Sequence, residues 1–283
     1  MELIIVTGLS GSGKSIALRV LEDSGYYCID NLPATLLPQI SHHLDVTSQN
    51  KVAISIDSRS AALEALPNAI DMLKNSGILI KVLFLESSVE TLVKRFSETR
   101  RKHPLSDANT TLAESISHER DLLTGITDLG HHIDSSNLSA NTLRNYILDF
   151  ISQPSNRHSS SGLVVLFTSF GFKNGLPLDA DFVFDVRSLP NPHYDPVLRP
   201  LTGKDAPIKA FLEKEPEVIE MLTDIQHYVE KWLPSFDADN RSYLTIAIGC
   251  TGGQHRSVYL VEQLSAHFKQ QKQNVIIRHR ELN

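Results

Sequence analysis

The chain has 283 residues, of which 41% are hydrophobic and 21% are charged. This balance excludes an intrinsically disordered chain, because enough apolar residues are present to build a core. The formal net charge of −6 excludes an overall polycation, so a surface for nucleic acid must be a local patch. The length lies near the upper limit of one hydrophobic core, so two domains compete with one.

Only two cysteines, Cys28 and Cys250, are present, which is too few for a disulfide framework or a four-cysteine zinc site. Their scarcity indicates a reducing compartment. The first residues, MELIIV, carry an acid where a signal peptide needs positive charge, and the longest apolar stretch, 78–85, is far shorter than the ~20 residues of a membrane helix. We therefore expect a soluble cytoplasmic protein without membrane contacts.

Apolar runs alternate with helical patterns through the first half of the chain. Strands are expected at 3–6, 26–29, 52–56 and 78–85, and helices at 15–23, 34–43, 61–74, 89–100, 112–123 and 138–150. Such alternation predicts a parallel sheet covered by helices. The polar stretch 153–162 then breaks the periodicity, so we expect a first domain at 1–153 and a linker at 154–162.

The remainder, 163–283, has the pattern of a second α/β domain. Strands are expected at 163–168, 182–186, 243–248 and 275–277, and helices at 218–232 and 257–270. Prolines at 190, 192, 196 and 200 predict a stiff, irregular loop. The last two strands and the helix between them form a second βαβ unit.

A phosphate-binding pattern, GxxxxGK[ST], lies between the first expected strand and the first expected helix. Its residues are Gly8, Leu9, Ser10, Gly11, Ser12, Gly13, Lys14 and Ser15. The glycines let backbone N–H groups turn toward phosphate oxygens at a helix N-terminus. A glycine turn alone explains the glycines but not Lys14 and Ser15, which would reach the β and γ phosphates and Mg²⁺ respectively. We therefore predict nucleotide binding.

Two aspartates follow neighbouring strands of the first expected sheet. Asp57 stands where a P-loop protein places the acid that organises magnesium, so Ser15 and Asp57 are the predicted magnesium residues. A simple turn residue is the alternative for Asp57. Asp30 is a candidate base or substrate clamp in a kinase, or a cap for the helix that follows.

The segment 94–102 concentrates five cations against one acid. In a small-molecule kinase it would be a lid whose arginines neutralise the transferred phosphoryl group. Alternatively it is a solvated helix face held by pairs with Glu98. Arg100 and Arg101 have no partner at that spacing, which keeps a phosphate or nucleic-acid contact open for them.

A second candidate oxyanion loop occurs in the C-terminal half, where Cys250 and Arg256 enclose five residues between a strand and a helix. This is the spacing at which a cysteine-phosphatase loop curls around a phosphate. Catalysis, simple phosphate recognition and a tight glycine turn all remain open. Other polar loops supply candidate walls for the same pocket: Lys173, Asp185, Arg187 and His193. The predicted fold class is thus α/β, with an N-terminal P-loop kinase-like parallel-sheet domain and a C-terminal α/β domain carrying a second phosphate-binding loop.

Basic residues gather near the end of the chain at Lys269, Lys272, Arg278 and Arg280. Such a local excess fits contact with a polyanion such as RNA, where backbone phosphates dominate the affinity. The alternative is that the two lysines simply favour a helix C-terminus.

Five stretches together resemble the RapZ family of RNase adapter proteins: 8–15, 27–33 (YCIDNLP), 169–173 (SFGFK), 185–193 (DVRSLPNPH) and 248–257 (IGCTGGQHRS). They span nearly the whole chain in order, and the last two are specific to that family. The resemblance implies an N-terminal domain that binds ATP at the P-loop and GTP, with a guanine-nucleotide-associated segment made of Asp57, Ser58, Arg59 and Ser60.

The resemblance also implies a C-terminal domain that binds RNA and senses glucosamine 6-phosphate. The residues it implies for the sugar-phosphate pocket are Lys173, His193, Cys250, Thr251, Gly252 and Arg256. Members that act as adapters present a small regulatory RNA to the endoribonuclease RNase E, which tunes synthesis of glucosamine-6-phosphate synthase. Other relatives are known chiefly as nucleotide-binding proteins, and the family forms homo-oligomers.

Our leading hypothesis is a regulatory adapter with at most weak ATPase or GTPase activity. One alternative is a small-molecule kinase that uses Lys14, Ser15 and Asp57, with Asp30 as its base. Another is a nucleotide-dependent metabolic sensor without an RNA role. A phosphatase with Cys250 as nucleophile is a further alternative, although the sequence offers no general acid for it.

Overall fold

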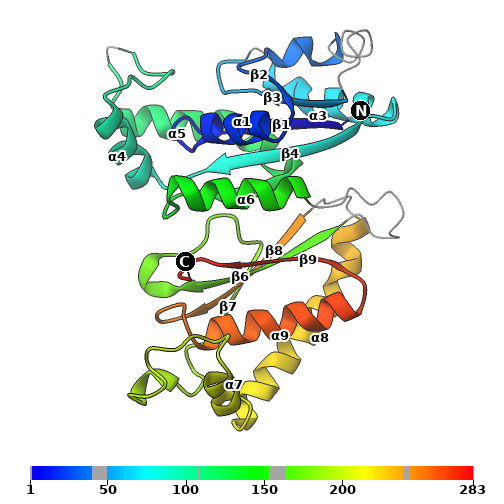
Figure 1. Cartoon of the computed structure of the whole chain (residues 1–283). Coiled ribbons are helices and arrows are strands. Elements are labelled where there is room, and N and C mark those ends of the chain that lie inside the picture. The colour runs from blue at the N-terminus through cyan, green and yellow to red at the C-terminus, as the bar shows by residue number, and fades with distance from the viewer. Residues whose placement is uncertain are drawn as a thin grey trace. The chain divides into compact units, whose positions relative to one another are not determined.

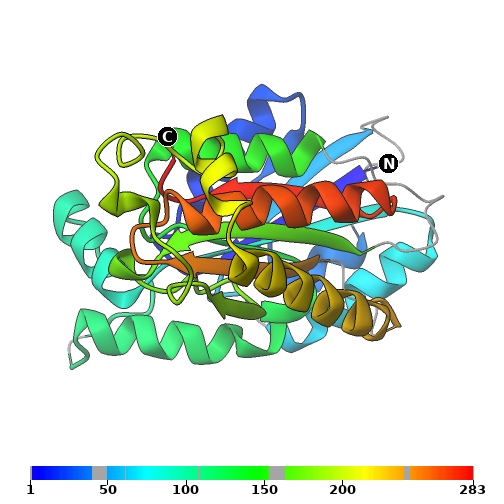
Figure 2. The same cartoon turned by 90° about the horizontal axis from the view of Figure 1, so that it is seen from below.

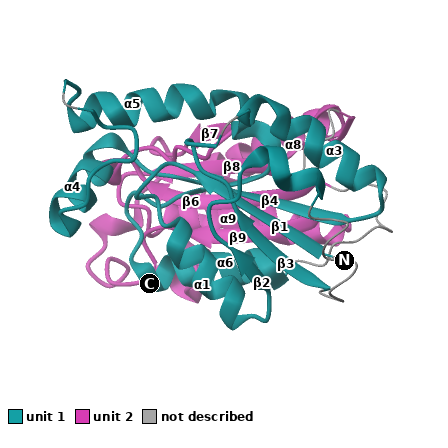
Figure 3. Cartoon of the chain, turned by 90° about the horizontal axis from the view of Figure 1, so that it is seen from above, with its two compact units in different colours: residues 1–156 teal, residues 157–283 magenta. Residues whose placement is uncertain are grey.

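The computed structural model describes residues 2–39, 50–60, 62–107, 109–152, 163–238 and 243–282 (Figures 1 and 2). The chain divides into two compact units, residues 1–156 and 157–283 (Figure 3). The expected linker, 154–162, lies outside the described residues. Among the helices that the structure describes, none is both long and apolar enough to cross a bilayer.

Unit 1 contains a five-stranded parallel sheet. In spatial order the strands are β2 (Tyr27–Ile29), β3 (Lys51–Ser55), β1 (Glu2–Gly8), β4 (Leu79–Glu86) and β5 (His131–Asp134). The central strand β1 is buried over almost its whole length, as a parallel sheet covered on both faces requires. The carboxyl ends of parallel strands meet at one edge, so the segments after β1, β2 and β3 converge there.

Helices cover both faces of this sheet (Figure 3). On one face α1 (Lys14–Asp23) packs against α6 (Ala140–Ser152), and on the other lie α3 (Leu66–Asn75), α4 (Val89–Thr99) and α5 (Leu112–Leu123). Helix α3 buries Leu66, Ala69, Ile70 and Leu73, which lie on one face of the helix. The start of α5 is fixed by a capping box between Thr111 and Glu114.

Unit 2 contains a four-stranded parallel sheet. Its strands in spatial order are β7 (Phe182–Asp185), β8 (Tyr243–Cys250), β6 (Val164–Gly171) and β9 (Asn274–His279). Helix α9 (Arg256–Gln270) packs on β6, β8 and β9 and alongside α8 (Pro216–Ala238), while the short α7 (Ala206–Leu212) also contacts α9 (Figure 2). The β8–α9–β9 crossover therefore passes over β6, which lies between the two strands.

The predicted fold class, α/β with two parallel sheets, is confirmed. Apart from short 3₁₀ helices, one strand and one α-helix of the described residues escaped prediction. Strand β5 has the sequence His-His-Ile-Asp, and its single aliphatic residue gives no hydrophobic periodicity. Helix α7 has only seven residues, too few to show a helical period. The expected helix 34–43 begins as a 3₁₀ turn, Ala34–Leu36, directly after Pro33, which is extended, and its part beyond residue 39 lies outside the described residues.

Candidate nucleotide site and second oxyanion loop

The P-loop has the backbone that its glycines allow. Gly8, Gly11 and Gly13 all have positive φ, at 122°, 84° and 112°. A Cβ on Gly8 would lie 1.9 Å from the carbonyl oxygen of Leu85 on the neighbouring strand β4. Only glycine fits that approach, which turns the chain out of β1 and into the loop. Gly13 then stands directly before α1, whose N-terminus faces the loop.

Lys14 lies curled into this loop. Its Nζ donates to the carbonyl oxygens of Gly8 at 2.6 Å and Leu9 at 3.1 Å. Burial lowers the pKa of Lys14, while the carboxylates of Glu119, Asp57 and Asp30 act in the opposite direction. The ammonium group therefore lies inside a loop whose shape suits the binding of phosphate oxygens.

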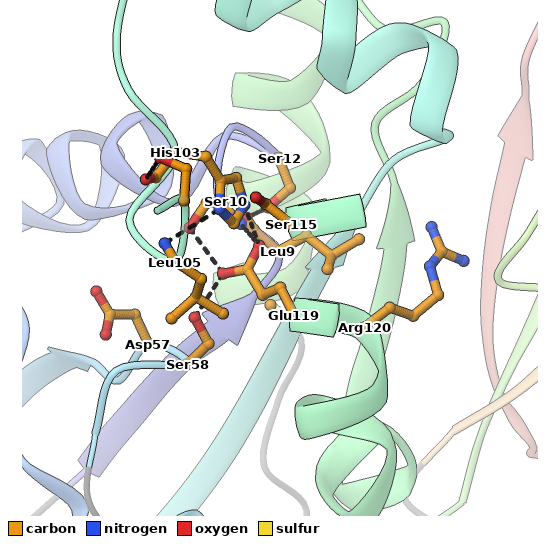
Figure 4. A network of polar contacts seen from close by, with 12 residues as sticks. Leu9, Ser10, Ser12, Asp57, Ser58, His103, Leu105, Ser115, Glu119 and Arg120 are labelled. Atoms are coloured by element: carbon orange, nitrogen blue, oxygen red, sulfur yellow. Dashed lines mark hydrogen bonds and ion pairs between the residues drawn. The ribbon is translucent and has the colours of Figure 1, made fainter. Parts of the chain in front are cut away.

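A buried carboxylate holds the loop from behind (Figure 4). Glu119, on α5, accepts hydrogen bonds from the Ser10 backbone N–H at 2.8 Å and Ser10 Oγ at 2.7 Å. It also accepts from Ser58 Oγ at 2.6 Å and His103 Nε2 at 3.1 Å. Burial opposes ionisation of Glu119, but these donors and the charge of Lys14 outweigh it and lower its pKa to about 2. One side chain thus joins three segments far apart in sequence.

Sequence reasoning missed Glu119. The available signal was its place on the helix: α5 buries Ser115, Ile116, Glu119 and Leu123, so an acid occupies the stripe that faces the core. A charged residue in such a stripe indicates a buried partner, because an unpaired carboxylate there is very costly.

Asp57 lies just beyond β3 and is 7% exposed. Arg59 donates to it through Nε at 3.0 Å and Nη2 at 2.5 Å, and the Arg59 backbone N–H adds a third hydrogen bond at 3.0 Å. Ser60 Oγ, in the same segment, accepts from the backbone N–H of Ala34 at 2.6 Å. The predicted magnesium acid is therefore paired with a cation in this state.

A cavity of about 490 Å³ brings most of the predicted site residues of unit 1 together. Its lining residues with chemical functions are Ser10, Lys14, Ser15, Asp30, Asn31, Asp57, Arg59, Arg95, Arg101 and Lys102. The serine hydroxyl and aspartate carboxylate are oxygen donors of the kind that Mg²⁺ prefers. Among the described residues there is no cluster of three side chains able to hold a metal alone, so an ion here would also need phosphate oxygens.

Arg95, near the start of the basic segment, lines the cavity and contacts the P-loop. Its Nη1 donates to the Gly11 carbonyl and to Ser135 Oγ, each at 3.0 Å, and its Nη2 to the Ser135 carbonyl at 2.6 Å. Arg95 thus braces the P-loop against the segment that follows β5. Arg101 and Lys102 lie beyond the end of α4, on the exposed side of the cavity.

The second loop follows β8. Cys250 is 3% exposed, and its Sγ accepts the Gly253 backbone N–H at 3.2 Å and lies 3.2 Å from Ser257 Oγ. Gly253 has a φ of 73°, and its position admits no side chain because a Cβ would lie 2.6 Å from the Gly171 nitrogen. Thr251 and Gly252 form the outer part of the loop, while Lys173 and His193 are exposed on other loops.

Arg256 is buried, with 3% of its surface exposed. Its Nη1 donates to the carbonyls of Arg187 and Leu189 at 2.8 Å each, which ties the proline-rich loop to α9. The other edge of the guanidinium is less engaged: Nη2 lies 3.4 Å from Thr251 Oγ1, and the buried Nε has no partner among the described residues. That edge is the fork that binds an oxyanion in a bidentate manner.

The basic residues near the end of the chain do not form one patch. Lys269 and Lys272 are exposed where α9 turns into β9, whereas Arg280 follows the far end of that six-residue strand, roughly 20 Å away. Arg278 is only 4% exposed, so its charge is not available at the surface. The two exposed lysines and the half-buried Arg280 therefore lie at opposite ends of β9.

These features define unit 1 as a P-loop α/β domain. Two family models cover the chain: the RapZ-like N-terminal domain over residues 1–154 and the RapZ C-terminal domain over residues 163–283. The chain belongs to the RapZ family.

Its curated relatives are similar over their full length. A nucleotide-binding protein of Methylobacillus flagellatus is 64% identical over 282 residues, which covers 100% of this chain and 99% of the relative. One of Chromobacterium violaceum is 54% identical over 283 residues, with coverage of 100% and 99%. Among solved structures, shikimate kinase from Acinetobacter baumannii in complex with shikimate covers 56% of this chain and 95% of its own, with 19% identity and a TM-score of 0.38. A structural likeness of that size carries no conclusion about function.

Proposed function

We propose that unit 1 binds a magnesium nucleoside triphosphate, ATP or GTP, at the P-loop. The observation that carries this proposal is the Lys14 ammonium group held inside a loop of three positive-φ glycines, at the wall of a cavity of about 490 Å³. The names of the relatives, nucleotide-binding proteins, support it. Isothermal titration with ATP, GTP and their diphosphates in the presence of Mg²⁺ tests it directly.

In this proposal Ser15 and Asp57 hold the magnesium ion together with the phosphates. The Arg59 guanidinium contacts only Oδ2 of Asp57, at 2.5 to 3.0 Å, so Oδ1, which accepts the Arg59 backbone N–H, is the oxygen that would face the ion. We assign the segment formed by Asp57, Ser58, Arg59 and Ser60 to guanine-nucleotide binding. ATPase or GTPase activity is at most weak in this proposal, and the main role of the site is regulatory binding.

We propose that the Cys250 loop binds glucosamine 6-phosphate. The supporting observation is the Nε and Nη2 edge of the buried Arg256, where Nε has no partner among the described residues and Nη2 makes only a long hydrogen bond to Thr251. Gly252 leaves room for the ligand, Lys173 and His193 supply polar walls, and Cys250 has a structural role as acceptor of the Gly253 N–H.

Arg256→Lys is expected to weaken glucosamine 6-phosphate binding about tenfold, because lysine keeps the charge but loses the bidentate fork. Titration calorimetry measures the change, and Arg144→Lys, at an exposed ion pair of α6, is the matched control. An unchanged affinity in a normally folded Arg256→Lys protein would remove Arg256 from the pocket.

We further propose the adapter role: the protein binds a small regulatory RNA, presents it to RNase E, and acts as a homo-oligomer in the cytoplasm. Support comes from membership of the RapZ family and from the exposed Lys269 and Lys272 and the half-buried Arg280. In this proposal the buried Arg278 stabilises β9 and does not contact RNA. Crosslinking in cells followed by sequencing of the bound RNA tests it, and sedimentation of the purified protein tests self-association.

The double variant Lys269→Ala/Lys272→Ala is expected to weaken binding to all RNA sequences alike. It should also reduce the slope of log affinity against log salt by about 1 to 2, since each lysine neutralises one phosphate. Filter binding at several salt concentrations gives the slope, and Lys214→Ala/Lys231→Ala removes the same charge from other exposed positions of unit 2. Equal slopes in the two double variants would count against this surface.

A further inference from the structure

The segment after α4 presents its neighbouring side chains in opposite directions. Arg101, Lys102 and Pro104 line the cavity that also contains Lys14 and Ser15. His103, in the middle of this run, is 3% exposed. Two consecutive cations that line the cavity therefore directly precede a buried histidine in the chain.

The histidine makes a hydrogen bond to the same carboxylate that holds the P-loop (Figure 4). His103 Nε2 lies 3.1 Å from Glu119 Oε2, and the Leu105 backbone N–H donates to His103 Nδ1 at 3.2 Å. Because Nδ1 accepts, the ring proton sits on Nε2 and points at Glu119. The same Oε2 atom accepts the Ser10 backbone N–H at 2.8 Å, so the basic segment and the P-loop share one anchor.

We propose that His103 and Glu119 are positioning residues that hold Arg101 and Lys102 over the terminal phosphate, so that the site distinguishes nucleoside triphosphates from diphosphates. This inference rests on the proposed nucleotide function. If the loop were untethered, its cations would lose conformational entropy when they bound the phosphate. The hydrogen bond of His103 to Glu119 restricts the loop before binding, so this entropy is not lost on binding. Only a ligand with the terminal phosphate gains from this arrangement.

The test is the ratio of affinities for a non-hydrolysable ATP analogue and for ADP, measured by titration calorimetry with Mg²⁺. His103→Ala is expected to lower the ratio about tenfold, the size of one charge-assisted hydrogen bond. His103→Gln keeps a donor nitrogen at similar reach to Nε2 and should retain most of the ratio. His118→Ala, exposed on the same helix as Glu119, is the matched control and should leave it unchanged.

A second variant separates positioning from folding. Arg101→Ala/Lys102→Ala alters only exposed side chains and should lower the ratio as much as His103→Ala does. The triple variant Arg101→Ala/Lys102→Ala/His103→Ala should lower the ratio little further, because all three residues act through the same contact with the terminal phosphate. The double variant decides the question if His103→Ala does not fold, as thermal unfolding will show.

Two outcomes would overturn the inference: an unchanged ratio in folded His103→Ala, which includes equal weakening of both ligands, or an unchanged ratio in Arg101→Ala/Lys102→Ala. Equal weakening is what a purely structural role of the buried histidine would give. If the unaltered protein binds neither ligand, the proposed nucleotide function fails. If it binds both equally well, only the positioning role fails.

Discussion

Lys14→Ala is expected to lower the affinity for a magnesium nucleoside triphosphate by about a hundredfold or more. In the structure the Lys14 ammonium group satisfies the carbonyls of Gly8 and Leu9. A bound triphosphate would exchange these neutral acceptors for charged oxygens of the β and γ phosphates. Two charge-assisted hydrogen bonds of roughly 1.5 to 3 kcal/mol each correspond to about a hundredfold or more in affinity. Titration with a non-hydrolysable ATP analogue measures the loss.

Lys94→Ala is the matched control for this variant, because Lys94 is an exposed cation of α4. It should bind the analogue as the unaltered protein does. The free energy of unfolding of Lys14→Ala must be measured as well, since removal of this half-buried cation takes away a charge that stabilises the ionised form of Glu119. Undiminished binding by a folded Lys14→Ala protein would place the nucleotide elsewhere.

The P-loop was predictable because its information is local. Eight consecutive residues carry the pattern, and the strand before it and the helix after it are visible in the hydrophobic periodicity. The carboxyl-edge position of Asp57 could be predicted for a similar reason, because parallel strands end at one edge whatever their order. Strand order itself, with β1 between β3 and β4, depends on pairings that no short pattern records.

The direction of side chains could not be predicted in the same way. Spacing left open whether the segment 94–102 is a lid or a solvated helix face, and it gave no sign that the Arg95 guanidinium would turn to Gly11 and Ser135, 84 and 40 residues away. Spacing also paired Arg256 with Cys250, but it gave no sign that one nitrogen of Arg256 would hold the carbonyls of Arg187 and Leu189. Such contacts are set by tertiary packing, which a one-dimensional pattern does not contain.

Glu119 is the residue whose role is least visible in sequence, and its removal makes the strongest prediction about stability. Its partner Ser10 is 109 positions away, and its other partners, Ser58 and His103, lie on two further segments. Glu119→Gln preserves the shape of the side chain but removes the charge that four donors point at. It also turns one accepting oxygen into an amide that faces donors, which leaves buried polar groups unsatisfied.

The pKa of Glu119 gives the sign and the pH range of this effect. The pKa is about 2 in the folded protein against 4.5 ordinarily, so the unfolded chain binds the proton more tightly. Ionised Glu119 therefore contributes stability that is fully present above its ordinary pKa and is lost as the pH falls from 4.5 toward 2. The shift corresponds to about 3 kcal/mol at pH 7.

Glu119→Gln is thus expected to lower the free energy of unfolding by about 3 kcal/mol at pH 7, with a smaller difference from the unaltered protein at pH 3.5. Urea unfolding at pH 7, 5 and 3.5 measures both proteins, and comparing them cancels the titration of every other carboxylate. Asp121→Asn, at an exposed position of the same helix, should show a small difference at every pH. A difference between Glu119→Gln and the unaltered protein that stays constant down to pH 3.5 would contradict the lowered pKa. The contribution of Glu119 would then come from packing, and its carboxylate charge could not be what holds the P-loop, the Ser58 segment and His103 together.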